Sequence, residues 1–114
     1  MLYYFKKRAS FDRVKNSSMA KIESEKAIER KLVEMCKENK ALCIKLLTYQ
    51  FIGLPDRMCL FPGGNIVFVE LKTTGEKPRK IQLNIHKKLR ELGFRVEVID
   101  TIEKVESLIY EFTC

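Results

Sequence analysis

The sequence predicts an α/β protein in which a small mixed β-sheet is flanked by helices. Three observations support this prediction. Apolar residues recur with helical spacing in three segments, short runs rich in β-branched and aromatic residues lie between them, and glycine or proline marks most of the boundaries. A chain of 114 residues also has the length of one ordinary domain. The expected order is helix, strand, strand, strand, helix, strand, helix.

The first half of the chain is expected to supply one helix and three strands. The helix covers residues 22 to about 40, with Ser24 as its N-cap. The strands are expected at residues 41–47, 57–61 and 66–72. The sequence PGGN at residues 62–65 is a hairpin-turn signal, so the second and third strands should pair as neighbours.

The second half of the chain is expected to supply a helix, a strand and a last helix. The helix begins at Pro78 and stops at Gly93, and its inward face is expected to carry Ile81, Ile85, Leu89 and Leu92. The strand is expected at residues 96–99 and the last amphipathic helix at residues 101–112.

The charge of the chain fits either an anionic partner or a surface charged for solubility, and net charge alone does not decide between them. The net charge is +7, and residues 1–18 alone contribute +4 of it. Such a balance favours nucleic acid first and an anionic membrane second. Residues 1–18 are interpreted as a basic N-terminal extension without sustained periodicity, and residues 19–114 as the domain. No apolar run is long enough to cross a bilayer and no secretory signal is visible, so we expect a cytoplasmic protein.

The four cysteines, Cys36, Cys43, Cys59 and Cys114, form no closely spaced metal-binding pair. Four thiolates would suffice for an iron–sulfur cluster. Three of the four, however, lie inside apolar stretches, where a free cysteine behaves as a small apolar residue. The sequence therefore favours buried thiols.

Acidic residues and one lysine meet near the end of the third strand. Glu70 and Lys72 lie on one face of that strand because side chains alternate, and taken alone they suggest a salt bridge. Asp56 opens the preceding strand, and the intervening hairpin turn can bring it beside Glu70. Two carboxylates so close repel each other unless a positive charge lies between them, and a hard cation such as Mg²⁺ would supply it.

A third acidic side chain comes from the first helix. Glu25 is expected on the face that meets the sheet, where acidic residues are unusual. Its simpler interpretation is a favourable charge at the helix N-terminus, and Glu29 is an alternative candidate for the same role.

A series of motifs resembles the VRR-NUC family of the PD-(D/E)XK nuclease superfamily. These motifs are GLPDR at residues 53–57, PGG at 62–64, FVELK at 68–72, PRKIQ at 78–82 and LRELGFRVEVID at 89–100. The resemblance covers residues 24–100, in order and with compatible spacing. It implies an αβββαβ restriction-endonuclease-like core of the stand-alone type that phages often encode.

The resemblance also implies roles for individual residues. Asp56, Glu70, the Leu71 carbonyl and Glu25 would hold Mg²⁺ or Mn²⁺, with Lys72 as the catalytic lysine and Gln82 as a further catalytic-site residue. The implied activity is metal-dependent DNA endonuclease activity, on branched DNA such as Holliday junctions and in a homodimer. Candidate pairing surfaces are the first strand and the apolar residues of the last helix, Leu108, Ile109 and Phe112.

DNA binding is expected from basic residues around the second helix. These residues are Arg57, Lys77, Arg79, Lys80, Lys87, Lys88 and Arg90. His86 and Lys45 receive no assigned role. Two alternatives stay open: a restriction- or repair-type nuclease acting on flaps or plain duplex, and a non-catalytic DNA-binding module with the same fold.

Overall fold

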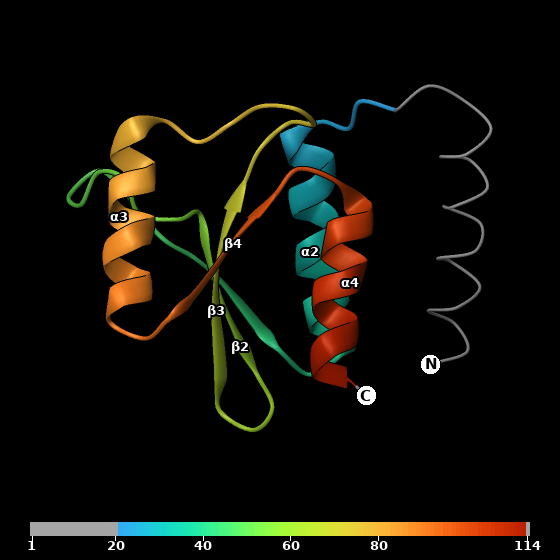
Figure 1. Cartoon of the computed structure of the whole chain (residues 1–114). Helices are drawn as coiled ribbons and strands as arrows, with labels where there is room; N and C mark the ends of the chain where they lie inside the picture. The colour runs from blue at the N-terminus through green and yellow to red at the C-terminus, as the bar shows by residue number, and fades with distance from the viewer. Residues whose placement is uncertain (1–20, 114) are drawn as a thin grey trace.

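The computed structural model describes residues 21–113, so the interpretation of residues 1–18 lies outside the described residues. Its elements, shown in Figure 1, are α2 (Glu25–Glu38), β1 (Leu42–Lys45), β2 (Arg57–Phe61), β3 (Asn65–Leu71), α3 (Lys80–Glu91), β4 (Arg95–Ile99) and α4 (Ile102–Thr113). The order matches the prediction in type and sequence. Across residues 21–113, no helix combines the length and apolar character that crossing a membrane requires.

The four strands form one mixed sheet in the order β1-β2-β3-β4. β1, β2 and β3 pair antiparallel, whereas β3 and β4 pair parallel. The hairpin between β2 and β3 pairs Phe61 with Asn65, so the PGG segment makes the turn that the sequence predicted. The predicted fold class, a small mixed sheet flanked by helices, is confirmed.

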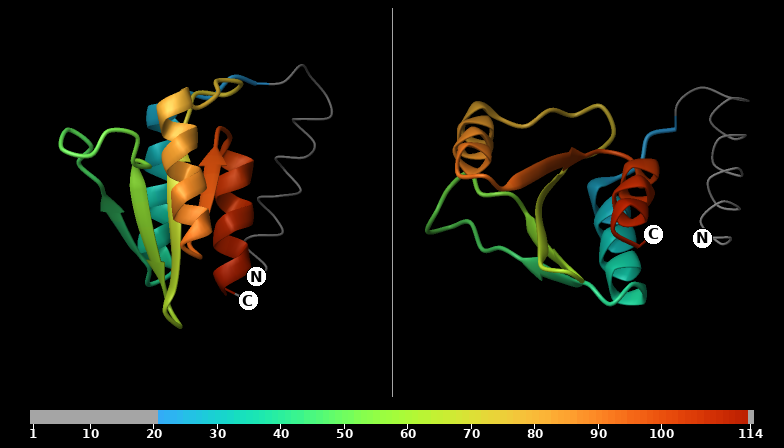
Figure 2. Two further views of the ribbon diagram at one scale, coloured as in Figure 1. Left: turned by 60° about the vertical axis from the view of Figure 1, so that its left-hand side comes forward. Right: turned by 60° about the horizontal axis from the view of Figure 1, so that its bottom comes forward.

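The helices cover the two faces of the sheet unequally. α2 and α4 pack against each other on one face, while α3 lies on the other (Figures 1 and 2). The core lies on the two-helix face, where Ile28 and Leu32 of α2 belong to one buried cluster with Val69 of β3. This cluster is the main source of apolar burial among the described residues.

The last helix offers little of the free apolar surface expected for pairing. Leu108 and Ile109 are buried in the core, and Phe112 stacks on Phe61 with ring centroids 4.4 Å apart. The reason is the partner helix: the apolar face of α4 is covered by α2 of the same chain. Leu42 and Ile44 on the edge strand β1 remain exposed.

The inward face of α3 differs from the prediction. Ile81 is 42% exposed and Leu92 is 75% exposed, whereas the residues that α3 buries are Gln82 and His86. The prediction of the buried side of α3 from its apolar residues was wrong. α3 lies over the face of β3 that carries Glu70, and a buried carboxyl group needs polar neighbours such as Gln82. Helical spacing alone fits both faces.

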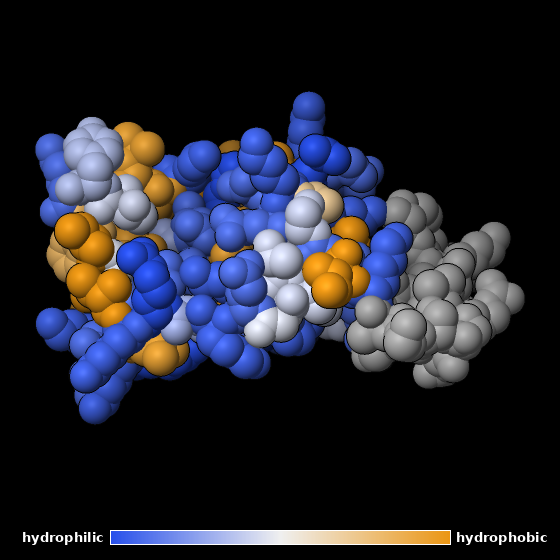
Figure 3. Space-filling view, turned by 90° about the horizontal axis from the view of Figure 1, so that it is seen from above, coloured by the Kyte–Doolittle hydropathy of each residue, from blue (hydrophilic) through white to orange (hydrophobic). Residues whose placement is uncertain are grey.

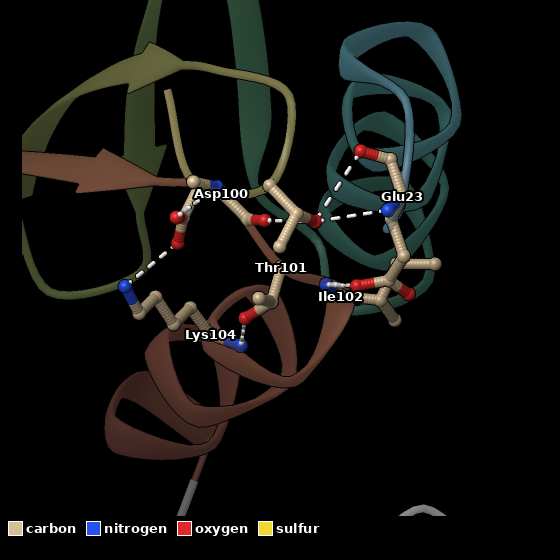
Figure 4. Close-up of polar contacts among 7 residues, drawn as sticks. Glu23, Asp100, Thr101, Ile102 and Lys104 are labelled. Atoms are coloured by element: carbon tan, nitrogen blue, oxygen red, sulfur yellow. Dashed lines mark hydrogen bonds and ion pairs between the residues drawn. The ribbon is translucent and has the colours of Figure 1, made fainter. Parts of the chain in front are cut away.

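A polar network fixes the start of α2 against the ends of β3 and β4 (Figure 4). The Glu23 N–H donates to the Thr74 hydroxyl (2.9 Å), and the Glu23 carboxylate accepts from the Ile102 N–H at the start of α4 (2.9 Å). The Thr74 hydroxyl donates to the Asp100 carbonyl (2.8 Å). Lys104 pairs with the Asp100 carboxylate at 2.7 Å. These contacts place the first turn of α2, and therefore Glu25, beside the end of β3.

Candidate active site

Asp56 and Glu70 are brought together by the β2–β3 hairpin. Arg57 pairs with Val69, so the residues that follow Val69 on β3 lie beside the residue that precedes Arg57. The Asp56 carboxylate accepts a hydrogen bond from the Leu71 N–H at 2.8 Å. This bond fixes Asp56 on the end of β3, in the arrangement that the hairpin predicted.

Glu70 is buried among groups that satisfy only one of its two oxygens. The carboxylate is 1% exposed. Its Oε2 accepts from the Gln82 amide (3.0 Å) and lies 3.7 Å from the Lys72 ammonium. Its Oε1 has no hydrogen-bond partner among the described residues. Burial, and after it the Asp56 charge, raises the pKa of Glu70 to about 8.

Gln82 is oriented by the start of α3. Its side-chain carbonyl accepts from the Arg79 N–H at 2.8 Å, which satisfies a backbone donor that the first turn of a helix leaves free. The amide nitrogen of the same side chain then has to face Glu70. Gln82 therefore reaches the site as predicted, and the helix end determines which of its atoms meets the carboxylate.

His86 is the site residue that the sequence analysis left without a role. Its side chain is completely buried, and its Nε2 lies 3.5 Å from Glu70 Oε1. Neither ring nitrogen has a hydrogen-bond partner among the described residues. Burial, followed by the Arg90 charge, lowers the pKa of His86 and favours the neutral ring. Its spacing of one turn from Gln82 indicated that it could approach the site, but a lone helical histidine is more often a surface or packing residue, and no role was assigned to it.

The loop before β2 is held against α3 at Gly53. This residue has φ +99°, and a Cβ there would lie 2.8 Å from the side chain of Ile85 and 2.9 Å from the Ile81 carbonyl. Glycine is therefore needed both for its backbone conformation and for the close approach. The contact carries Asp56, three residues later, toward the face of the sheet that holds Glu70.

Glu25 reaches the site from α2, but it is exposed rather than buried against the sheet as predicted. It lines a pocket of about 350 Å³ together with Asp56, Glu29 and Lys45. Partial burial, and after it the Asp56 charge, raises the pKa of Glu25. Glu29, the alternative candidate, pairs with Arg57 at 3.0 Å instead.

That pairing also changes the set of basic residues available to a ligand. The Arg57 side chain is 15% exposed and donates to Glu29 and to the Cys43 carbonyl. We therefore remove Arg57 from the expected DNA-binding set, because its charge and donors are already used within the chain. The other six residues of that set are exposed: Lys77, Arg79, Lys80, Lys87, Lys88 and Arg90.

The acidic cluster suits a hard divalent cation. Asp56, Glu70 and Glu25 offer only oxygen ligands, the kind that Mg²⁺ and Mn²⁺ prefer. Glu70 Oε1 accepts no hydrogen bond from the described residues, and a cation bound there would supply the positive partner that this buried oxygen lacks.

Comparison with known proteins gives the fold family and the class of the chain. The chain is similar to a protein named "Putative nuclease p44" from Acyrthosiphon pisum secondary endosymbiont phage 1, with 39% identity over 77 residues, 68% of this chain and 83% of the relative. A solved structure described as a VRR-NUC domain matches with a TM-score of 0.70 and 29% identity, covering 79% of this chain and 99% of that one. No family model matches the sequence.

Fold and relatives together define the class: this is a nuclease with an α/β restriction-endonuclease-like core. Within that class, the chain belongs to the VRR-NUC family.

Proposed function

We propose that this nuclease is a metal-dependent endonuclease that hydrolyses DNA phosphodiester bonds. Asp56, Glu70 and the Leu71 carbonyl would hold Mg²⁺ or Mn²⁺, with Glu25 as a further ligand directly or through water. The observation that carries the proposal is the buried Glu70 side chain, one oxygen of which accepts no hydrogen bond from the described residues, near the Asp56 charge.

The residues around the acidic cluster would have separate roles in the reaction. A bound divalent cation supplies Lewis-acid stabilisation of phosphoryl oxygens and lowers the pKa of water. Lys72, which lies 3.7 Å from Glu70, would orient the attacking water and offset negative charge as the transition state forms. Gln82 fixes the Glu70 carboxylate through its hydrogen bond. His86 fills the space behind Glu70 and excludes water from that side.

DNA would bind along the exposed cations of α3 and of the segment before it. Charge for phosphate contacts would come from Lys77, Arg79, Lys80, Lys87, Lys88 and Arg90, and residues 21–113 contain no recognisable base-reading motif. Arg90 also donates to the Val96 carbonyl at 2.8 Å, which holds its side chain against β4. Recognition by backbone contacts favours a substrate chosen by shape.

We therefore propose branched DNA, such as a Holliday junction, as the substrate and a homodimer as the active form. Two symmetric cuts require two sites, and the acidic cluster occurs once in the described residues. Exposed apolar residues support self-association: Leu42 and Ile44 on the sheet edge, and Leu47, Phe51 and Ile52 before β2. Figure 3 shows apolar side chains gathered at the end of the molecule that holds α3 and that loop. The relative's phage origin supports action in the cytoplasm of a bacterial host.

Cleavage assays on three substrates test these proposals together. A four-way junction, a flap and a plain duplex would be incubated with Mg²⁺, Mn²⁺ or EDTA, beside a sizing measurement of the protein. We expect metal-dependent cutting that is fastest on the junction, and a dimer in solution. Full activity of Asp56→Ala would reject the site. Binding without cleavage of any substrate would favour a non-catalytic module, and preference for the flap or duplex would reject the junction.

A further inference from the structure

A second cluster of potential metal ligands lies away from the acidic site. The sulfur atoms of Cys36, Cys43 and Cys59 all lie within 4.8 Å of one another. Cys36 comes from the last turns of α2, Cys43 from β1 and Cys59 from the facing position on β2. Cys36 and Cys59 are buried, Cys43 is half-buried, and all three are free thiols. Residues far apart in the sequence therefore converge on one point.

The separations match those of thiolates around one cation. Cys59 Sγ lies 3.9 Å from Cys36 Sγ and 3.9 Å from Cys43 Sγ. With Zn–S bonds of about 2.3 Å, tetrahedral geometry puts neighbouring sulfur atoms about 3.8 Å apart. The three sulfur atoms therefore offer one cation three ligands from three elements.

The electrostatic surroundings also favour a thiolate in the trio. The Arg57 guanidinium donates to the Cys43 carbonyl at 3.3 Å, which brings a positive charge beside the trio. Binding of a cation would release thiol protons, since a thiolate is the ligand form.

We propose that Cys36, Cys43 and Cys59 form a binding site for one soft cation of the Zn²⁺ or Cu⁺ class. Thiolates select such ions over the hard cations that suit the acidic cluster, so the two sites would not compete. Since Cys43 is half-buried, a fourth ligand can come from solvent. The bound ion would tie the end of α2 to the β1–β2 pair and so stabilise the two-helix face of the sheet. This proposal does not depend on the nuclease reaction.

Metal binding to the full chain tests the proposal directly. Purified metal-free protein, with its thiols reduced, would be titrated with Zn²⁺ against a chromophoric chelator. We expect one tightly bound Zn²⁺ per chain and a rise in the melting temperature, because binding to the native state alone stabilises it. A parallel titration with Co²⁺ should give the near-ultraviolet absorption of a thiolate–cobalt bond. Absence of that absorption in the natural sequence would overturn the proposal, whatever the variants do.

Three variants assign the ion to the trio. Cys43→Ser is the informative change, because this residue is half-buried and serine is close to it in size; it should lose Zn²⁺ binding and the rise in melting temperature. Asp56→Asn removes an acidic-site ligand and should keep both, as should Cys114→Ser. Retention in Cys43→Ser with loss in Asp56→Asn or Cys114→Ser would refute the trio as the site. Cys43→Ser should retain metal-dependent cleavage with Mg²⁺, since Cys43 lies outside the acidic cluster.

Discussion

The two faces of the sheet differ in what they bury. On the face covered by α2 and α4, β3 contributes Val67, Val69 and Leu71 to an apolar cluster. On the face covered by α3, the same strand presents Glu70 to Gln82 and His86, all three of them buried. Three atoms of Glu70 and His86 have no hydrogen-bond partner within residues 21–113.

This difference separates stability from chemistry within one strand. The two-helix face stabilises the fold through apolar burial. This contribution does not depend on the orientation of particular atoms, but a buried polar group without a hydrogen bond would weaken it. The α3 face accepts buried polar groups whose requirements a cation or a substrate would satisfy. Alternation of side chains along β3 allows the two tasks to share seven residues without interfering.

The largest expected effect on cleavage comes from replacing an acidic residue of the site on the α3 face. Asp56→Asn should abolish cleavage, lowering the rate by more than about 100-fold, because loss of a direct ligand exceeds the effect of losing a group that only orients one. Folding, measured by circular dichroism, should be kept. The exposed Glu91→Gln serves as the control and should cleave like the natural sequence. Comparable activity of the two variants would contradict the assignment of Asp56.

Shortening a core side chain on the two-helix face should instead lower stability and leave the cleavage rate unchanged. Leu32 is fully buried in the core, so Leu32→Ala should lower the free energy of unfolding by about 2–5 kcal/mol through lost burial and a cavity. Urea unfolding measures this change. Leu83→Ala, a half-exposed position on α3, should cost far less. Below the unfolding transition, Leu32→Ala should keep its cleavage rate; a specific loss of activity in the folded variant would argue against separate tasks.

The raised pKa of Glu70 gives the α3 face a pH dependence in cation-free protein. Because the pKa is raised from 4.5 to about 8, the folded state keeps a proton that the unfolded chain has released across this window. The free energy of unfolding should therefore fall as pH rises from about 4.5 to about 8, by at most about 5 kcal/mol. Thermal unfolding in EDTA measures this slope. Glu70→Gln cannot ionise and should flatten it; an unchanged slope would assign the effect to other groups.

Gln82 offers a finer test of how the α3 face is organised. Gln82→Ala removes the donor to Glu70, so it should lower the cleavage rate by about 10–100-fold while leaving an active enzyme. Raising the Mg²⁺ or Mn²⁺ concentration should restore part of the loss, because the carboxylate itself remains. The exposed neighbour Asn84→Ala is the matched control. Equal rates for both variants would show that Glu70 needs no orientation by Gln82.

Much of this architecture could be predicted from local sequence patterns. Ser24 caps α2 as expected, with its hydroxyl accepting from the Ala27 N–H at 3.1 Å, and the PGG turn sets the β2–β3 register. That register follows from turn chemistry and strand alternation, both of which are local. It was sufficient to predict that Asp56 and Glu70 converge.

Other features depend on contacts that local patterns do not encode. His86 was left without a role because a helix can turn any of several faces inward, and the choice depends on what the sheet presents. Arg57 was expected to bind DNA because its pairing with Glu29 is not visible in the sequence, where the two residues lie 28 positions apart. The Cys36–Cys43–Cys59 trio had no recognisable spacing for the same reason, since its members meet only when α2, β1 and β2 pack together.

The amino-acid sequence by itself determined the order of helices and strands, the pairing of the central hairpin and the residue types of the acidic cluster, because these follow from side-chain periodicity and turn conformation. The tertiary structure alone decided which side of α3 is buried, which acid stays available at the pocket and where three thiols meet. Those choices are made by packing between distant segments, where burial makes each charge and each polar atom depend on its particular neighbours.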